Sequence, residues 1–177
     1  MTITPDTKDW TWVLRERCPQ CGFDASAVAP DRFADDIRAA AAAFAQVLER
    51  GEETRRRPDP AVWSPLEYAC HVRDVFRMFD DRLRLMLTTD DPLFENWDQD
   101  ATAEQNAYGS QDPQRVRAQL LEAGERLAQA FGSVPAASLV RTGRRSDGAS
   151  FTVVTLGQYL LHDLVHHVWD VTGEPAG

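Results

Sequence analysis

Ser64-Pro65-Leu66-Glu67 marks the start of a long helix and decides how the rest of the chain is interpreted. Serine is a preferred N-cap residue, proline is favoured at the first helical position, and glutamate three residues after the serine completes a capping box. Apolar residues then recur at steps of three and four: Leu66, Ala69, Val72, Phe76, Phe79, Leu83 and Met86. This pattern predicts a helix from Pro65 to about Thr88 with one buried stripe.

Three further segments show the same helical periodicity. They span about Pro30–Arg50, Pro113–Phe131 and Thr155–Val171, and the last begins with a Thr-x-x-Gln capping box at Thr155 and Gln158. Four amphipathic helices of this length predict an all-α four-helix bundle. Long connectors separate them, and strand content is slight, with one short strand suggested at Ser150–Val153.

The length and charge of the chain limit the classes of protein to which it can belong. A chain of 177 residues fits a single domain over residues 1–177, in which residues 1–29 form an N-terminal extension. A net charge of −9 argues against nucleic acid, because phosphate binding needs clustered basic residues. The chain holds no run of 18 apolar residues, its N-terminus does not resemble a secretory signal, and its three cysteines suit a reducing compartment. We therefore expect a cytoplasmic protein that does not bind membranes.

All four histidines fall in the second and fourth predicted helices. His162 and His166 are spaced i, i+4, so their rings stack on one face of the helix. At 100° per residue this pair lies at the edge of the apolar face, and His71 flanks the stripe of the second helix in the same way. Two interpretations remain open from the residues alone: hydrogen-bonded or solvated histidines, or ligands of one metal ion held between facing helices.

Acidic residues lie close to these histidines in sequence. His167 shares a helical face with Asp163 and Asp170, which predicts a histidine–carboxylate hydrogen bond. Asp170 is also four residues after His166 and could orient that ring. Glu67, four residues before His71, could orient His71 or serve only the capping box.

Cys18-Pro19-Gln20-Cys21 resembles half of a zinc knuckle. A structural zinc site needs four protein ligands. With the histidines assigned to another site, only Cys70 remains to complete it. A turn or packing role is therefore favoured for the cysteines, with a metal site or a redox pair as alternatives.

Two motifs resemble those of the DinB/YfiT-like superfamily. Residues 63–74, WSPLEYACHVRD, resemble its second-helix motif, and residues 156–167, LGQYLLHDLVHH, resemble its fourth-helix His-x-x-x-His motif. Residues 9–12 and 18–24 resemble the start of an actinobacterial branch. The resemblance implies an up-down-down-up bundle and a divalent metal, zinc or nickel, held by three histidines. By position these histidines are His71, His162 and His166.

The resemblance also implies an activity. Relatives act as thiol-dependent S-transferases or isomerases with mycothiol or bacillithiol, and the maleylpyruvate isomerases among them have glutamate in place of one histidine. The present chain follows the three-histidine pattern. We therefore expect a metal-dependent thiol S-transferase or isomerase that acts on a small electrophile, with the thiol at an open metal position. Arg141, Arg144 and Arg145 are candidates to bind the thiol cofactor, and Arg55–Arg57 are a second basic cluster.

Two other functions fit the same sequence. A metal-dependent hydrolase would use water in place of the thiol. A non-catalytic metal- or ligand-binding stress protein would close its site with a fourth protein ligand. For each of these functions we expect a homodimer, because bundles of this size often associate through apolar stripes.

Overall fold

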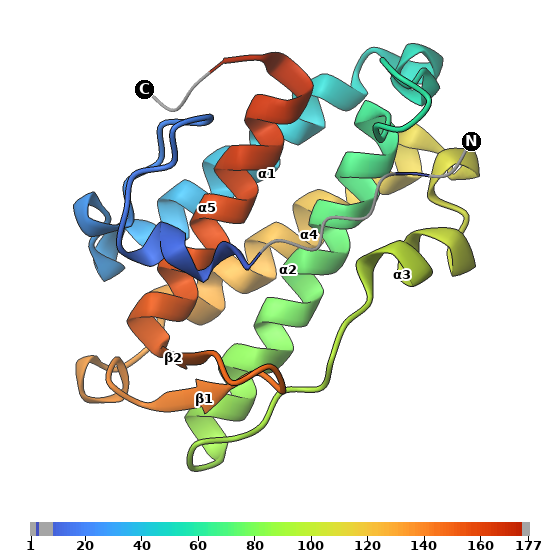
Figure 1. Ribbon diagram of the computed structural model, residues 1–177. Coiled ribbons are helices and arrows are strands. Elements are labelled where there is room, and N and C mark those ends of the chain that lie inside the picture. Colours follow the sequence, from blue (N-terminus) through green and yellow to red (C-terminus); the bar gives the residue numbers. More distant parts are fainter. Residues whose placement is uncertain (1–2, 4–8, 175–177) are drawn as a thin grey trace.

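The structure is a computed structural model that describes residue 3 and residues 9–174, and it consists mainly of helices (Figure 1). The α-helices are α1 (Phe33–Leu48), α2 (Pro65–Thr88), α3 (Gln99–Gln105), α4 (Pro113–Gly132) and α5 (Val153–Thr172). The strands are β1 (Thr142–Arg144) and β2 (Ser150–Thr152). None of the helices in the described part of the chain is long and apolar enough to cross a membrane.

The four long helices form a bundle. Both α4 and α5 pack against α1 and α2, whereas α1 and α2 have little contact with each other and so lie diagonally opposite. In the view of Figure 1, α1 and α5 run upward and α2 and α4 run downward. The structure thus confirms the predicted all-α bundle with up-down-down-up order.

The start of α2 follows the sequence signal. The Ser64 side chain accepts a hydrogen bond from the Glu67 backbone N–H at 3.2 Å, and the Glu67 carboxylate accepts one from the Ser64 N–H at 2.8 Å. The predicted apolar stripe is buried. It packs with the apolar faces of the other long helices into one core, whose largest fully buried side chains include Phe33, Phe44, Phe76, Leu83 and Leu127.

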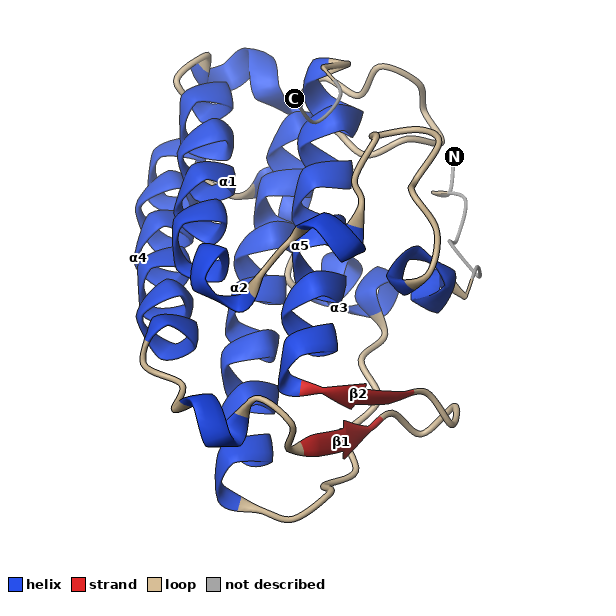
Figure 2. Cartoon of the chain, turned by 90° about the vertical axis from the view of Figure 1, so that its left-hand side faces the viewer, coloured by secondary structure: helices blue, strands red, loops and turns tan. Residues whose placement is uncertain are grey.

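The start of α5 differs from the prediction. The helix begins at Val153 with Thr152 as its N-cap, and Thr155 completes the capping box. The cause is the strand that precedes it, because β2 ends at Thr152 and leads directly into the helix (Figure 2). Gln158 has another role: its side-chain amide donates hydrogen bonds to the carbonyl oxygens of Ala25 at 2.8 Å and Val28 at 3.1 Å.

The long connectors are partly folded. The segment between α2 and α4 contains α3 and a short 3-10 helix at Tyr108–Ser110. The strand suggested near Ser150 is β2, which pairs antiparallel with β1, so that Phe151 lies opposite Gly143. The N-terminal segment, residues 9–29, packs against α5 and forms a 3-10 helix at Trp10–Leu14. Residues 1–2 and 4–8 of the predicted extension lie outside the described residues.

Candidate metal centres

Side chains of the types that bind metals form two groups, and both groups include residues of α5. The donor atoms of Cys18, Cys21, His162 and His166 lie within 4.8 Å of one another; we call these residues the Cys18 group. The donor atoms of His71, Asp163 and His167 also lie within 4.8 Å of one another; we call these residues the His71 group.

This arrangement corrects the expectation that His71, His162 and His166 come together. Asp163 and His167 form a second i, i+4 pair, rotated by about 100° from the pair His162 and His166. Helix α2 packs on the face that carries Asp163 and His167. The N-terminal segment covers the face of His162 and His166, so the predicted trio is divided between two groups.

His71 is buried on α2 among aromatic rings. Its ring stacks on Trp97 with centroids 5.3 Å apart, lies 5.1 Å from the ring of Trp63, and meets His167 edge-on at 4.9 Å. Burial lowers the pKa of His71 well below its usual value, so the imidazole is neutral. Among the described residues, neither of its ring nitrogens has a hydrogen-bond partner. Burying such a group costs about 1–3 kcal/mol, and a bound cation would offset this cost at the nitrogen that carries the lone pair.

His167 faces a carboxylate on each side. Its Nδ1 lies 2.9 Å from Asp170 Oδ2, which confirms the predicted histidine–carboxylate hydrogen bond. A proton on Nδ1 leaves the Nε2 lone pair on the side of Asp163, whose Oδ1 lies 3.6 Å from Nε2. Nitrogen and oxygen ligands of one tetrahedral zinc ion lie about 3.3–3.5 Å apart. The residues of the His71 group therefore fit a divalent cation.

The two carboxylates predicted to orient histidines have different partners. Asp170 Oδ1 lies 4.0 Å from His166 Nε2, so the hydrogen bond of Asp170 goes to His167. The Glu67 carboxylate accepts hydrogen bonds from the Ser64 N–H and from Arg57 Nε, both at 2.8 Å. It makes no hydrogen bond to His71, so its role in the described structure is to cap α2.

Two clefts adjoin the His71 group. A cleft of about 720 Å³ has Trp63, Tyr68, Trp97, Asp163, His167 and Asp170 among its lining residues. A smaller cleft of about 190 Å³ is lined by residues that include His71, Arg82, Trp97, Arg145, Tyr159 and Asp163. The group thus lies where two clefts meet, accessible to a small molecule and surrounded by aromatic rings.

One of the three predicted cofactor-binding arginines lines a cleft. Arg145 does so, with Nη1 3.2 Å from the hydroxyl oxygen of Tyr159, and it pairs with Asp147. Arg141 instead donates hydrogen bonds to backbone carbonyls at the end of α2, and Arg144 forms an exposed ion pair with an aspartate. In the second basic cluster, Arg55 donates a hydrogen bond to a backbone carbonyl, and Arg57 donates one to the Glu67 carboxylate. These hydrogen bonds hold the connectors in position.

Arg82 is a further residue of the smaller cleft, and its sequence position alone did not identify it. It lies on α2 beside the rings of Phe79 and Phe94, with its guanidinium carbon 5.2 Å from the Phe94 centroid, and it lines the smaller cleft. Burial lowers the pKa of Arg82 to about 10, and no ion pair of Arg82 is present among the described residues. The sequence does contain one indication of this arrangement. Arg82 follows His71 by three helical turns, which places both residues on one face of the helix.

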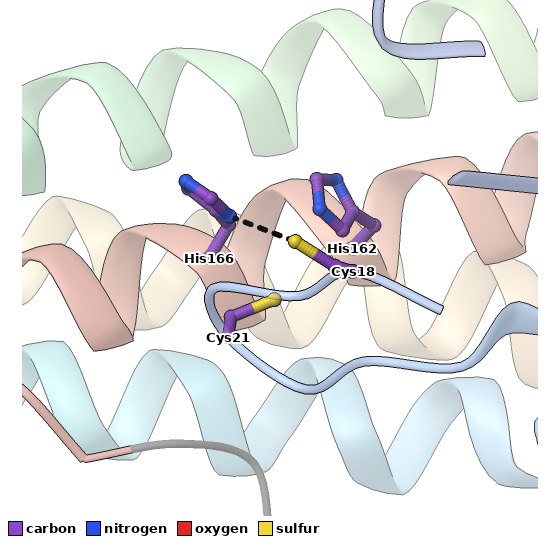
Figure 3. Close-up of side chains that lie close together, drawn as sticks. All are labelled: Cys18, Cys21, His162 and His166. Carbon is purple, nitrogen blue, oxygen red and sulfur yellow. Dashed lines mark hydrogen bonds between the residues drawn. The ribbon is translucent and has the colours of Figure 1, made fainter. Parts of the chain in front are cut away.

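The Cys18 group is the more buried of the two. Its members are 0% to 8% exposed, and Cys18 Sγ lies 3.7 Å from His166 Nδ1 (Figure 3). Burial raises the pKa of Cys21 to about 11 and lowers the pKa of His162 to about 3. The missed signal was the combination of Cys-x-x-Cys with His-x-x-x-His, which is the ligand spacing of Cys2His2 zinc sites.

The fold and these two groups define a four-helix-bundle protein whose last helix carries two sets of metal-ligating side chains. The family model of the DinB superfamily matches residues 31–171, and the chain belongs to this superfamily. Its structure resembles that of YfiT from Bacillus subtilis, described as a probable metal-dependent hydrolase with an unusual four-helix bundle topology. The two are 20% identical with a TM-score of 0.74, over 83% of this chain and 87% of that chain. No curated protein matches the sequence significantly.

Proposed function

We propose that the protein is a metal-dependent thiol S-transferase or isomerase, and that its electrophilic substrate carries a carboxylate. The observation that carries the proposal is His71, a fully buried imidazole beside Asp163 and His167 whose two ring nitrogens have no hydrogen-bond partner in the described part of the chain. The clefts that meet at this group have room for a small molecule. The description of YfiT as a probable metal-dependent enzyme gives further support.

His71, Asp163 and His167 are the residues that would hold the cation. Two imidazoles and one carboxylate suit zinc, nickel or iron. Three protein ligands are typical of catalytic sites, because the remaining position is left for a small molecule. A bound divalent cation would supply Lewis acidity at the point where the clefts meet.

The other residues bind and orient the reactants. Arg82 and Arg145 present guanidinium groups in the smaller cleft, where they can bind the carboxylate of the electrophile. Trp63 and Trp97 cover His71 and exclude water from it. The thiol, for example mycothiol, occupies the larger cleft and loses its proton to solvent. Its sulfur forms a bond to one carbon of a C=C bond conjugated to a carbonyl group, the π electron pair of that bond moves to the neighbouring carbon, and this carbon takes up a proton from solvent. A transferase releases this adduct, whereas an isomerase breaks the same bond after rotation and recovers the thiol.

Metal content and thiol consumption test the proposal. We expect His71→Ala, Asp163→Ala and His167→Ala each to lose one equivalent of metal, measured by elemental analysis of protein purified without an affinity tag. Thiol consumption with carboxylate-bearing electrophiles should fall by about 100-fold or more. Cys70→Ala, a buried neighbour of His71 on α2, is the matched control and should keep both properties. Unchanged metal content in all three variants would exclude the proposed site.

A hydrolase is the second candidate. Asp163 and Asp170 line the larger cleft beside His167, and a carboxylate near the histidines favours hydrolysis because it can take a proton from water. The YfiT description agrees with this alternative. A panel of esters, amides and alkylating electrophiles, each assayed with and without thiol, separates the two reactions. Turnover that does not depend on thiol would favour the hydrolase.

The non-catalytic alternative requires a different number of protein ligands at the metal site. It needs a site closed by four protein ligands. The Cys18 group has four such side chains, whereas the described residues supply three to the His71 group, which adjoins the clefts. Absence of turnover across the whole panel, in protein with full metal content, would favour it.

A further inference from the structure

We propose that Cys18, Cys21, His162 and His166 bind a second metal ion, a structural zinc that fastens the N-terminal segment to α5. The cysteines come from the segment before α1, and the histidines come from the last helix of the bundle. A metal at this point would join two parts of the chain that are almost its full length apart. The proposal does not depend on the activity proposed above.

The distances fit one tetrahedral ion. All four donor atoms lie within 4.8 Å of one another, and the contact between Cys18 Sγ and His166 Nδ1 is 3.7 Å. Zinc bonds of about 2.3 Å to sulfur and about 2.0–2.1 Å to nitrogen place neighbouring ligands about 3.3–3.8 Å apart. Only small side-chain movements are therefore needed to bring the four atoms to bonding distance.

Backbone hydrogen bonds close the turn that carries the two cysteines. The Gly22 N–H donates a hydrogen bond to the Cys18 carbonyl at 2.9 Å, and the Cys18 N–H donates one to the Phe23 carbonyl at 2.8 Å. Gly22 has a φ of 79°, in the left-handed region that favours glycine. This turn holds both thiols beside the histidine pair on α5 (Figure 3).

His162 gives independent evidence for a ligand. It is 3% exposed, and its Nε2 has no hydrogen-bond partner among the described residues. The residues that the structure describes thus leave this buried nitrogen unsatisfied, which is costly. A disulfide between Cys18 and Cys21 would leave it unsatisfied as well, whereas a metal ion accepts its lone pair.

The group is closed, as a structural site requires. The cysteines are 0% to 1% exposed, and the Trp10 ring lies 5.4 Å from the His162 ring and 5.0 Å from the His166 ring. The two histidines contribute to the wall of the larger cleft, but the cysteines are absent from its described lining. Two thiolates and two imidazoles fill the four positions of a tetrahedral zinc and leave none for a substrate. The Cys18 group therefore stabilises structure, whereas the His71 group faces the clefts.

Cobalt(II) tests the proposal in the full-length protein. Cobalt bound by thiolates gives a sulfur-to-metal charge-transfer absorption in the near ultraviolet, which the thiol-free His71 group cannot produce. We expect the metal-free wild-type protein to develop this band, and His71→Ala, which retains the Cys18 group, to saturate it with one equivalent of cobalt. The band should be absent from Cys18→Ser/Cys21→Ser and unchanged in Cys70→Ser, which removes the third buried cysteine. His71→Ala should keep the band, so that failure at one centre is distinguished from failure at the other.

Three results would overturn the proposal: no band in the wild-type protein with excess cobalt, a band that persists in the double serine variant, or a band that Cys70→Ser removes. Alkylation of the wild-type protein, followed by peptide mass spectrometry, covers the case in which the double variant does not fold. Zinc should slow modification of Cys18 and Cys21 by about tenfold or more relative to chelated protein. Equal rates with and without zinc, or a disulfide between these two cysteines, would also contradict it.

Discussion

Asp170 shows how one carboxylate can favour a particular form of a neighbouring histidine. Its Oδ2 lies 2.9 Å from His167 Nδ1, whereas its Oδ1 lies 4.0 Å from His166 Nε2. The hydrogen bond fixes the orientation of the His167 ring and favours the tautomer whose Nε2 is able to bind a cation. The role of Asp170 is thus to position His167.

Replacement of Asp170 should weaken metal binding at the His71 group. We expect Asp170→Ala to raise the dissociation constant for zinc by about 10–100-fold, as is typical when a carboxylate that orients a ligating histidine is lost. Asp170→Asn, which keeps a hydrogen-bond acceptor, should recover part of the loss. Competition with a chromophoric chelator measures the constant, and Glu174→Gln, an exposed residue just beyond α5, is the control. Equal affinities in Asp170→Ala and the wild type would show that Asp170 has no positioning role.

The buried neutral histidines should make the metal-free protein sensitive to acid. The pKa values of His71 and His162 are lowered in the folded state, chiefly by burial, so the unfolded chain takes up protons first as the pH falls below about 6.5. The folded state therefore loses stability between about pH 6.5 and the lowered values. We expect a lower urea midpoint at about pH 5 than at about pH 7.5 with a chelator present. His162→Asn should show a smaller decrease, and equal midpoints for the wild type would contradict the expectation.

At the scale of elements, local signals were sufficient for α2 but not for α5. The Ser64–Glu67 capping box involves residues three apart, so the sequence alone locates the start of α2. The start of α5 depends on the pairing of β2 with β1, which the sequence showed only as one short apolar stretch. The composition of the connectors likewise did not reveal that α3 lies within one of them.

Assignment of the histidines failed for a related reason. The pairs His162–His166 and Asp163–His167 have the same i, i+4 spacing and differ by one step of 100° around α5. The spacing cannot say which pair faces α2, because that depends on packing between helices. Nor does the spacing predict that Cys18 lies beside His166, because 148 residues separate them in the sequence. The candidate residue types were therefore recognisable in the sequence, whereas their grouping was not.

The contact between α1 and α5 should not tolerate an added methyl group at Gly157. A Cβ at this position would lie 2.3 Å from a ring carbon of Phe33, which is fully buried against the same helix. We expect Gly157→Ala to lower the free energy of unfolding by about 1–3 kcal/mol, measured by urea denaturation. At Gly132, the nearest side-chain atom would be 3.5 Å away, so Gly132→Ala should change stability by about 0.5 kcal/mol or less. Similar effects of the two substitutions would argue against this close packing.

For the whole molecule, α5 is the element on which both centres depend. It packs against α1 and α2 on one side, and the N-terminal segment packs against it from outside. The side chains that we propose as ligands on α2 and on the N-terminal segment approach α5 from different sides. Binding at either centre should therefore stabilise the folded state as a whole, because the unfolded chain does not assemble the ligands.

Metal removal should lower the melting temperature. We expect chelation to decrease Tm, and added zinc to restore it by an amount that grows with the logarithm of the free zinc concentration. The effect should be smaller in Cys18→Ser/Cys21→Ser than in the wild type, since only one centre remains. Differential scanning calorimetry measures both. A Tm that does not respond to chelator or zinc would contradict stabilisation by metal.

The matched family region begins at residue 31, after both cysteines. Two of the four side chains of the Cys18 group therefore lie before the matched family region, and the other two lie on a helix within it. We therefore expect the cysteine pair and the histidine pair to occur together among members of the superfamily. Superfamily members that carry a Cys-x-x-Cys turn before the first helix should keep histidines at the positions of His162 and His166, and members without the turn should be free to vary there.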